Sequence, residues 1–174
     1  PGRKSQSLAQ ASFDAWVKYY RSDENTPNAT VSYYAKGSLV ALALDLSLRS
    51  RSQGTVSLDH VMRRLWRQSS GGPIGEADIM AALRAVAGRG IGERLAAELR
   101  AWVHGKGELP LRAALQAAGV RWRVQPPTLA QRWGLRVSES ALAGVKLTAV
   151  LRGGAAERAG LAVGDELLAI NDWR

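Results

Sequence analysis

Cysteine is absent from these 174 residues, and histidine occurs only twice. The lack of cysteine excludes disulfide bonds and thiolate metal ligands, and it leaves the cytoplasm and the periplasm equally open as the compartment. Long apolar runs are also missing, since the longest spans six residues, Leu39–Leu44, against about 20 for a membrane helix. The sequence therefore predicts no membrane span, and no signal peptide is visible, because no N-terminal segment combines basic residues with a long apolar stretch.

Positive charge is in excess, with a formal net charge of +9. The basic residues are scattered, and their densest group, Arg63, Arg64 and Arg67, lies on an expected helix. A nucleic-acid binder is expected to show a basic patch with interleaved aromatic residues. The tryptophans stand among aliphatic residues instead, so charge alone does not predict a nucleic-acid partner.

Helical periodicity dominates the first two thirds of the chain. Ser12 is a candidate cap for a helix in which Phe13, Trp16, Val17 and Tyr20 recur at i, i+3, i+4 and i+7. This spacing predicts one helix with a single apolar stripe.

The segment Asn28–Arg49 is the most informative part of the chain. It opens with two candidate caps, Asn28 and Thr30, and then runs without proline or a turn cluster. The run Leu39–Leu44 is apolar on every side, which predicts a helix over about 31–51 that is buried within a larger protein.

Several further helices are expected from caps and breakers. Asp45 and Arg49 are four residues apart and are predicted to pair on one helix face. The other expected helices follow the cap Ser57, cover Glu76–Ala87 and Glu93–His104 on either side of a glycine hinge at Gly88–Gly92, and run from about Pro110 to Gly119.

After Gly119 the periodicity changes from helical to alternating. Val120–Val124 alternates apolar and basic residues, which predicts a half-buried strand. Pro126-Pro127 is the expected domain boundary. Beyond it the sequence predicts strands over 133–138, 145–151 and 166–170 and a short helix over 155–159.

The C-terminal text, WGLRV followed by GVKLTAVLRGGAAERAGLAVGDELLAIND, resembles a PDZ domain. In this interpretation Ala159 and Gly160 pack the short helix against the sheet. Gly164-Asp165 makes the tight turn into a strand whose Leu167 and Ile170 face inward. The alternative is that these glycines only make turns.

The PDZ resemblance also implies a peptide-binding loop. Trp133-Gly134-Leu135 resembles the apolar-Gly-apolar loop whose backbone amides receive a peptide carboxylate during strand addition. The sequence stops at Arg174, directly after an expected turn at Asn171-Asp172. A complete PDZ domain adds a long helix and a closing strand, so the expectation is an unfinished groove in a fragment truncated at both ends.

Tyr34-Ala35-Lys36-Gly37 fits a Tyr-x-Lys-Gly pattern that resembles the zinc aminopeptidases of the aminopeptidase N and leukotriene hydrolase kind. The wider text, SYYAKG followed by LDLSLR, is similar to the glycyl aminopeptidase family of metallopeptidases. This resemblance implies that Tyr34 stabilises the oxyanion of the transition state, with Tyr33 as the competing candidate. From the residues alone, Tyr34 is a core residue with its hydroxyl at the rim. Gly37 is expected to let a neighbouring helix approach closely.

The resemblance implies a zinc cofactor in the full-length parent and no metal ligand in this chain. His60 and His104 are far apart and neither has a second histidine at ligand spacing. His60 is expected to be a surface or boundary residue, and His104 suits the C-terminus of a helix. The glycines of Gly88–Gly92 faintly resemble a phosphate loop, but they follow a helix and lack the Lys-Ser/Thr continuation, which favours a hinge.

The expected fold is mainly α. A helical bundle over 1–126 would form the C-terminal part of a gluzincin-type catalytic domain, followed over 127–174 by a small α+β PDZ-like domain that is incomplete at its C-terminus. The expected function is that of a zinc aminopeptidase fragment, inactive alone, whose parent releases small N-terminal residues such as glycine from peptides. The alternative is a non-catalytic PDZ-containing scaffold that binds peptide termini. Both readings make peptides the partners, without nucleic acid.

Overall fold

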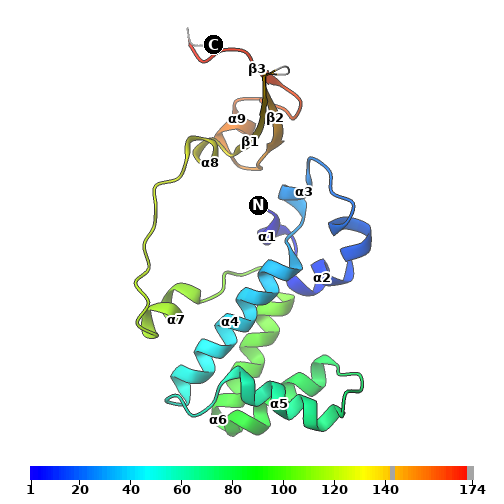
Figure 1. Cartoon of the computed structure of the whole chain (residues 1–174), viewed down its shortest axis with the longest axis vertical. Coiled ribbons are helices and arrows are strands. Elements are labelled where there is room, and N and C mark those ends of the chain that lie inside the picture. The colour runs from blue at the N-terminus through cyan, green and yellow to red at the C-terminus, as the bar shows by residue number, and fades with distance from the viewer. Residues whose placement is uncertain (142–143, 172–174) are drawn as a thin grey trace. The chain divides into compact units, whose positions relative to one another are not determined.

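The computed structural model describes residues 1–141 and 144–171. The chain (Figure 1) divides into two compact units, one of Pro1–Gln6, Gln10–Ser32 and Val124–Arg174 and the other of Ser7–Ala9 and Tyr33–Arg123. The fold is mainly helical with a small antiparallel sheet near the C-terminus, which confirms the predicted fold class. The boundary predicted at Pro126-Pro127 stays a prediction, and it lies just beyond the point where the chain leaves the second unit. Within the described residues, no helix is both long and apolar enough to cross a membrane.

The second unit is helical. Its helices are α4 (Tyr33–Arg51), α5 (Leu58–Ser69), α6 (Glu76–His104) and α7 (Leu111–Ala117). Helices α4 and α6 lie side by side in Figure 1. The core of this unit is aliphatic and draws on three of these helices: Val40, Leu44 and Leu48 from α4, Val61 and Leu65 from α5, and Met80, Leu83, Leu95 and Leu99 from α6. Burial of such side chains is the main force that holds the helices together.

Helix α4 confirms the predicted helix, with differences at its start and on one face. Asn28 and Thr30 do not cap it, because both belong to the end of the preceding short helix. Leu39 and Leu42 are exposed, so the helix is buried on one face rather than on every side. The predicted pair is present, since Arg49 Nε donates to Asp45 Oδ2 at 2.8 Å.

Helix α5 begins after Ser57, as predicted. The backbone N–H of Ser57 donates to His60 Nδ1 at 3.1 Å, which satisfies a polar group at this helix start. The first helical N–H, that of Leu58, donates to Asp45 Oδ1 at 2.8 Å. Asp45 therefore joins α4 to the positive end of the α5 dipole.

Helix α6 is a hairpin rather than one rod. Gly88 interrupts it with φ 74° and ψ 169°, a backbone conformation that essentially only glycine adopts. The chain then folds back, so that Glu76 and His104 at the two ends come within 2.8 Å of each other. A Cβ added to Gly92 would lie 2.7 Å from the Cα of Arg84, which shows how closely the two arms pack. The predicted glycine hinge is confirmed at Gly88, whereas residues 89–92, expected to belong to the hinge, are already part of the helical second arm.

Helix α7 starts directly after Pro110 and is followed by Gly119 with φ 82°, as expected. The predicted strand Val120–Val124 is wrong. This segment is extended and exposed, and the described sheet holds only three strands, none of them from this segment. Alternation alone does not make a strand when no partner is beside it.

The first unit contains α1 (Gly2–Ser5), α3 (Thr26–Ala29), the π-helix η1 (Ala15–Tyr19) and most of α2 (Leu8–Phe13). The single helix predicted after Ser12 is wrong, because α2 already covers Ser12 and the helix breaks at Asp14. Its predicted apolar stripe is exposed, and Phe13 keeps 90% of its surface accessible.

The C-terminal part of this unit is the PDZ-like sheet and its short helices. Helix α8 (Leu129–Trp133) leads into β1 (Leu135–Ser140), and β2 (Gly144–Val150) lies antiparallel to it. After α9 (Ala155–Arg158), β3 (Glu166–Leu167) pairs with β2, which gives the order β1-β2-β3. Compared with the prediction, β1 starts two residues later, at Leu135, and β3 is shorter.

Two details of the predicted PDZ packing differ. Leu167 and Ile170 are exposed rather than inward-facing in the described residues. Gly160 has φ 81° and no atom within 4 Å of an added Cβ, so its role is conformational rather than one of close packing. Close approach occurs instead between Gly134 and Gly154, where a Cβ on Gly134 would lie 3.0 Å from the Cα of Gly154. The turn predicted at Asn171-Asp172 extends outside the described residues.

Asn28 links α3 to the sheet within this unit. Its amide Nδ2 donates to the carbonyl of Val150 at 2.8 Å, and its Oδ1 accepts from the N–H of Arg152 at 2.8 Å. One buried amide thereby satisfies a donor and an acceptor where β2 ends.

Candidate functional site

The candidate site is the first turn of α4, where Tyr34 and Lys36 point in different directions. Residues two apart on a helix are separated by about 200° around its axis. Tyr34 keeps 62% of its surface exposed, whereas Lys36 keeps 7%. The Tyr-x-Lys-Gly element therefore presents a phenol to the outside and buries an amine inside the helical unit.

Lys36 is held by the end of α6. Its Nζ donates to the carbonyl of Gly105, the residue that ends α6, at 3.3 Å. Burial lowers the pKa of Lys36 from 10.5, and the nearby charge of Glu108 partly opposes this shift. A carbonyl at a helix C-terminus suits an ammonium group, because the helix dipole is negative there.

The ring of Tyr34 lies against that of Tyr33. The two ring centroids are 4.2 Å apart with an interplanar angle of 31°, a spacing at which aromatic pairs attract. Tyr33 is half-buried and so restricts its neighbour. The reading of Tyr34 as a core residue does not describe this structure, because its side chain is exposed.

Gly37 has more room than expected. The nearest atom to an added Cβ is Leu8 Cδ1 at 3.9 Å, an ordinary van der Waals contact. Within the described residues, no neighbouring helix therefore comes close enough to require a glycine here.

The predicted peptide-binding loop lies at the junction of α8 and β1. Trp133 ends α8, Gly134 has φ 75°, and Leu135 starts β1. The Gly134 N–H donates to the carbonyl of Ala130 at 2.9 Å, so a peptide carboxylate would have to compete with this bond. Strand β1 is an edge of the described sheet, which is the geometry that strand addition uses.

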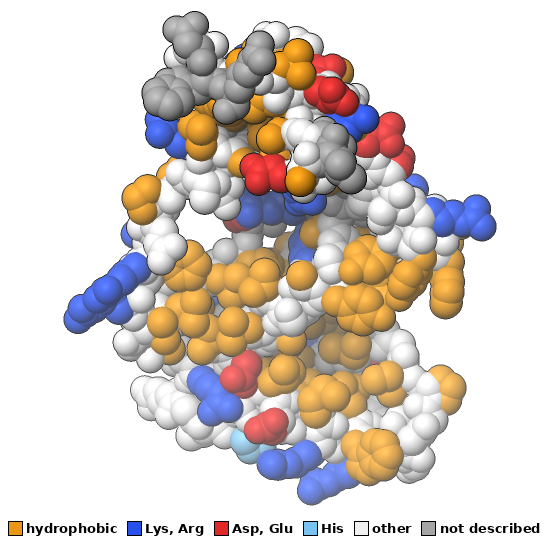
Figure 2. Space-filling model, turned by 45° about the horizontal axis from the view of Figure 1, so that its top comes forward, with side chains coloured by type: hydrophobic (Ala, Val, Ile, Leu, Met, Phe, Trp, Pro, Cys, Tyr) orange, Lys and Arg blue, Asp and Glu red, His pale blue; other side chains and the backbone are white. Residues whose placement is uncertain are grey.

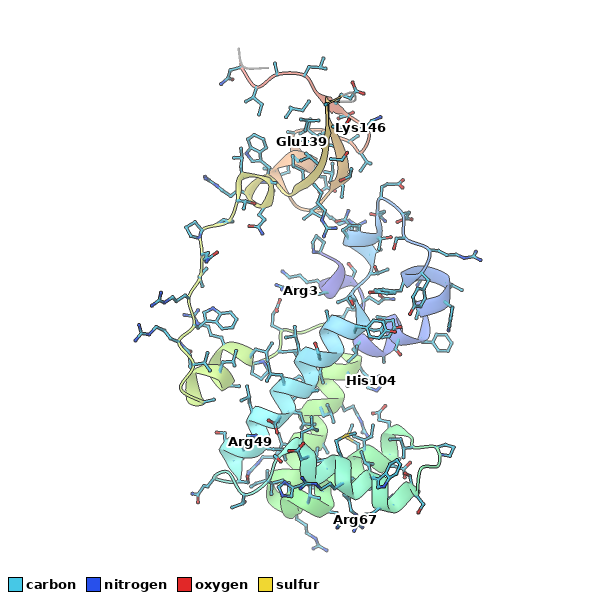
Figure 3. All side chains as sticks on the ribbon, in the orientation of Figure 1. Arg3, Arg49, Arg67, His104, Glu139 and Lys146 are labelled. Carbon is cyan, nitrogen blue, oxygen red and sulfur yellow. The ribbon has the colours of Figure 1, made fainter. Side chains whose placement is uncertain are left out.

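The described residues do not fit a zinc site. Across 1–141 and 144–171, no group of three or more His, Cys, Asp or Glu side chains lies together as metal ligands. His60 bonds through Nδ1 to Ser57, and His104 Nε2 lies 2.8 Å from Glu76 Oε2 (His104 is labelled in Figure 3). The part of the chain that the structure describes therefore offers zinc no set of ligands.

Two contributions differ from what the sequence predicts. Asn28, a candidate helix cap by sequence, instead bonds through its amide to the end of β2. The burial of Lys36 has no counterpart among the sequence predictions. Its position, two residues from Tyr34 on the same helix, was a usable signal, because the two side chains had to face different ways.

Two family-model matches, each over part of the chain, support a peptidase-related protein with a PDZ module. Residues 1–40 match the family model described as M61 glycyl aminopeptidase, and residues 121–173 match that of the PDZ domain. The resemblance of the chain to a glycyl aminopeptidase joined to a PDZ domain is thereby confirmed. The first match includes Tyr34 and Lys36, and the second includes Trp133–Leu135. No curated protein matches the chain.

Proposed function

We propose that the full-length parent of this chain is a zinc aminopeptidase that releases small N-terminal residues such as glycine, and that Tyr34 donates a hydrogen bond to the oxyanion formed at the scissile carbonyl. The observation that carries this proposal is that the two side chains in the first turn of α4 differ in exposure. Lys36 is buried and bonded to Gly105, while Tyr34 is exposed beside it.

A fixed phenol suits this role for a physical reason. Donors that are oriented before the reaction cost no reorganisation when charge develops, and each contributes about 3–4 kcal/mol of transition-state stabilisation. Packing against Tyr33 limits the rotation of the Tyr34 ring. The hydrogen bond of Lys36 to Gly105 also restrains the helix backbone that carries Tyr34.

Zinc enters this proposal only as the cofactor of the full-length parent. The metal supplies Lewis-acid polarisation of the carbonyl when bound. Its ligands, and the general base, would come from residues outside this chain, since the described residues form no such set.

The test replaces single hydroxyl groups in the full-length enzyme. Tyr34→Phe removes one oxygen and is expected to lower kcat on a glycyl anilide by about two orders of magnitude. Tyr33→Phe is the matched control, because it alters the neighbouring ring in the same way and is expected to leave kcat within about twofold. Near-normal turnover by Tyr34→Phe would remove Tyr34 from the mechanism.

The second candidate is a non-catalytic scaffold that binds peptide termini through its PDZ module. The edge position of β1 beside the Trp133–Leu135 loop favours this reading. Two measurements on the purified chain separate the candidates. We expect no aminopeptidase activity with added zinc and no measurable affinity for peptides with free C-termini. Affinity that is lost when the peptide C-terminus is amidated would support the scaffold.

A further inference from the structure

Helix α5 carries a basic stripe that the proposed function does not use. His60, Arg63, Arg64 and Arg67 stand at i, i+3, i+4 and i+7, a spacing that places them on one side of a helix. All four side chains are exposed. The other side of α5 packs into the core of the unit through Val61 and Leu65.

The stripe lines a groove rather than a flat surface. A cavity of about 490 Å³ is bounded by these four side chains, by the loop Thr55-Val56 and by Val86 of α6. Arg67 is labelled on α5 in Figure 3, and Figure 2 shows Lys and Arg side chains close to a histidine on the face that it draws. The volume falls in the range of small-molecule sites, about 300–1,000 Å³.

The three arginines of the groove are not neutralised by the described residues. Some arginines elsewhere in this unit pair with carboxylates, as Arg84 does with Glu93 at 3.0 Å and Arg51 with Glu98 at 2.8 Å. No such ion pair joins a described carboxylate to the groove arginines, and Asp59, the one carboxylate of α5, does not line the cavity. Like charges held together in this way favour an anion between them.

His60 adds a donor to the groove. Its Nδ1 accepts a hydrogen bond from the Ser57 N–H at 3.1 Å, so the proton of the neutral ring is on Nε2. Each guanidinium can bind a phosphate through two parallel N–H groups. The stripe spans about 10 Å along the helix axis, which exceeds what one phosphate can bridge.

From this arrangement we propose that the α5 groove binds a small anion carrying two or more phosphate groups. A nucleic acid is the less suitable occupant, because the exposed aromatic residue of α5, Trp66, does not line the groove and offers no stacking surface inside it. An acidic peptide is also less suitable, since a carboxylate carries one charge where a phosphate carries about two.

The experiment measures binding of inorganic triphosphate to the whole chain by calorimetry. Arg63→Gln with Arg67→Gln is expected to weaken binding at least tenfold. The control, Arg112→Gln with Arg123→Gln, removes the same charge from two exposed arginines outside the groove and is expected to change binding less than twofold. All four positions are exposed, so folding should be retained.

Several results would overturn the proposal. Absence of triphosphate binding would do so directly. Equal weakening in both double variants would show attraction by net charge without a site. A single-stranded oligonucleotide or an oligo-glutamate peptide that binds the groove arginines more tightly than triphosphate does would assign the groove to that class instead. Competition by pyrophosphate, with inorganic phosphate at least tenfold weaker, would support it.

Discussion

Lys36 and Gly105 are joined by a hydrogen bond of 3.3 Å from the ammonium group to the backbone carbonyl, across 69 residues of sequence. The bond fastens the first turn of α4 to the end of α6. Because Lys36 is two residues from Tyr34, the same contact fixes the part of the helix that carries the candidate oxyanion donor. Packing of the helical unit and geometry of the site thus depend on one buried amine.

Because the pKa of Lys36 is lowered, the free energy of unfolding is expected to depend on pH in the alkaline range. In the folded chain Lys36 loses its proton at a lower pH than in the unfolded chain, where its pKa is 10.5. Between those two pKa values the unfolded state holds more protons, so the free energy of unfolding rises with pH. We expect the stability difference between the wild type and Lys36→Met to grow in the wild type's favour across that window. Urea denaturation from pH 8 to 10.5 measures it, and a constant difference would contradict the assignment.

Replacing Asp45 is expected to lower the free energy of unfolding more than replacing its ion-pair partner, Arg49. Burial alone would raise its pKa, but hydrogen bonds from the Leu58 N–H and from Arg49 outweigh this effect and lower the pKa below 3.8. Asp45→Ala removes an acceptor at the start of α5 and is expected to cost about 1–2 kcal/mol. Arg49→Ala breaks an exposed pair and should cost about 0.5 kcal/mol or less.

The Asp45 contribution also has an acid limit. Its stabilisation is present above the unfolded pKa and is lost as the pH falls through the lower folded pKa. Denaturation at pH 7 and at pH 2–3 should therefore show a smaller gap between the wild type and Asp45→Ala in acid. A gap of equal size at both pH values would assign the effect to packing.

Two glycines inside helices are predicted to respond to alanine with opposite signs. Gly37 has only Leu8 Cδ1 at 3.9 Å from an added Cβ, so Gly37→Ala should stabilise the chain by about 0.5–1 kcal/mol through helix propensity. Gly92→Ala would place its Cβ 2.7 Å from the Cα of Arg84 and 3.1 Å from the carbonyl oxygen of Leu83. Thermal unfolding should show a loss of about 1–3 kcal/mol. Equal effects would mean that the two arms of α6 are not packed at Gly92.

Asn28→Ala should expose the end of β2. The substitution leaves the Val150 carbonyl and the Arg152 N–H without their partner, at a cost of about 1–3 kcal/mol. Hydrogen exchange at the Arg152 amide is the direct readout and should accelerate at least tenfold. The control is Ser22→Ala, which removes an exposed hydroxyl that donates to the Tyr19 carbonyl. It should leave the exchange rate of the Arg152 amide unchanged. Unaltered exchange in Asn28→Ala would show that the amide is protected by other contacts.

Much of the helical part could be predicted from local signals. Ser57, Gly88 and Gly119 act within a few residues of themselves, and each marks the end or the interruption that was expected. The strand prediction for Val120–Val124 is wrong because a strand needs a partner, and alternation in one segment does not reveal whether a partner is present. The prediction of one helix with a buried stripe after Ser12 is wrong for a similar reason, since periodicity indicates an apolar face but not what covers it.

The candidate site was predictable only in part. Tyr34 was identified by resemblance, and its role remains a prediction. The contact of Lys36 with Gly105 depends on how α4 and α6 pack, and no local pattern encodes a distance across that packing. The groove on α5 was visible in sequence only as a dense group of arginines. Its depth comes from Val86 and the loop at Thr55-Val56, which the fold brings beside them.

Gly88 touches neither the phenol nor the amine, yet the position of both depends on it. Apart from its chain neighbours and the nearby backbone of the same helix, no described atom lies within 4 Å of where its Cβ would be, so the position requires a backbone dihedral angle and not space. If this residue favoured an ordinary helical angle, α6 would continue straight and carry Gly105 away from Lys36. The backbone angle of Gly88 thus helps to set the position of the Tyr34 motif from a distance, and a residue with a Cβ at this position would strain the turn without touching the motif.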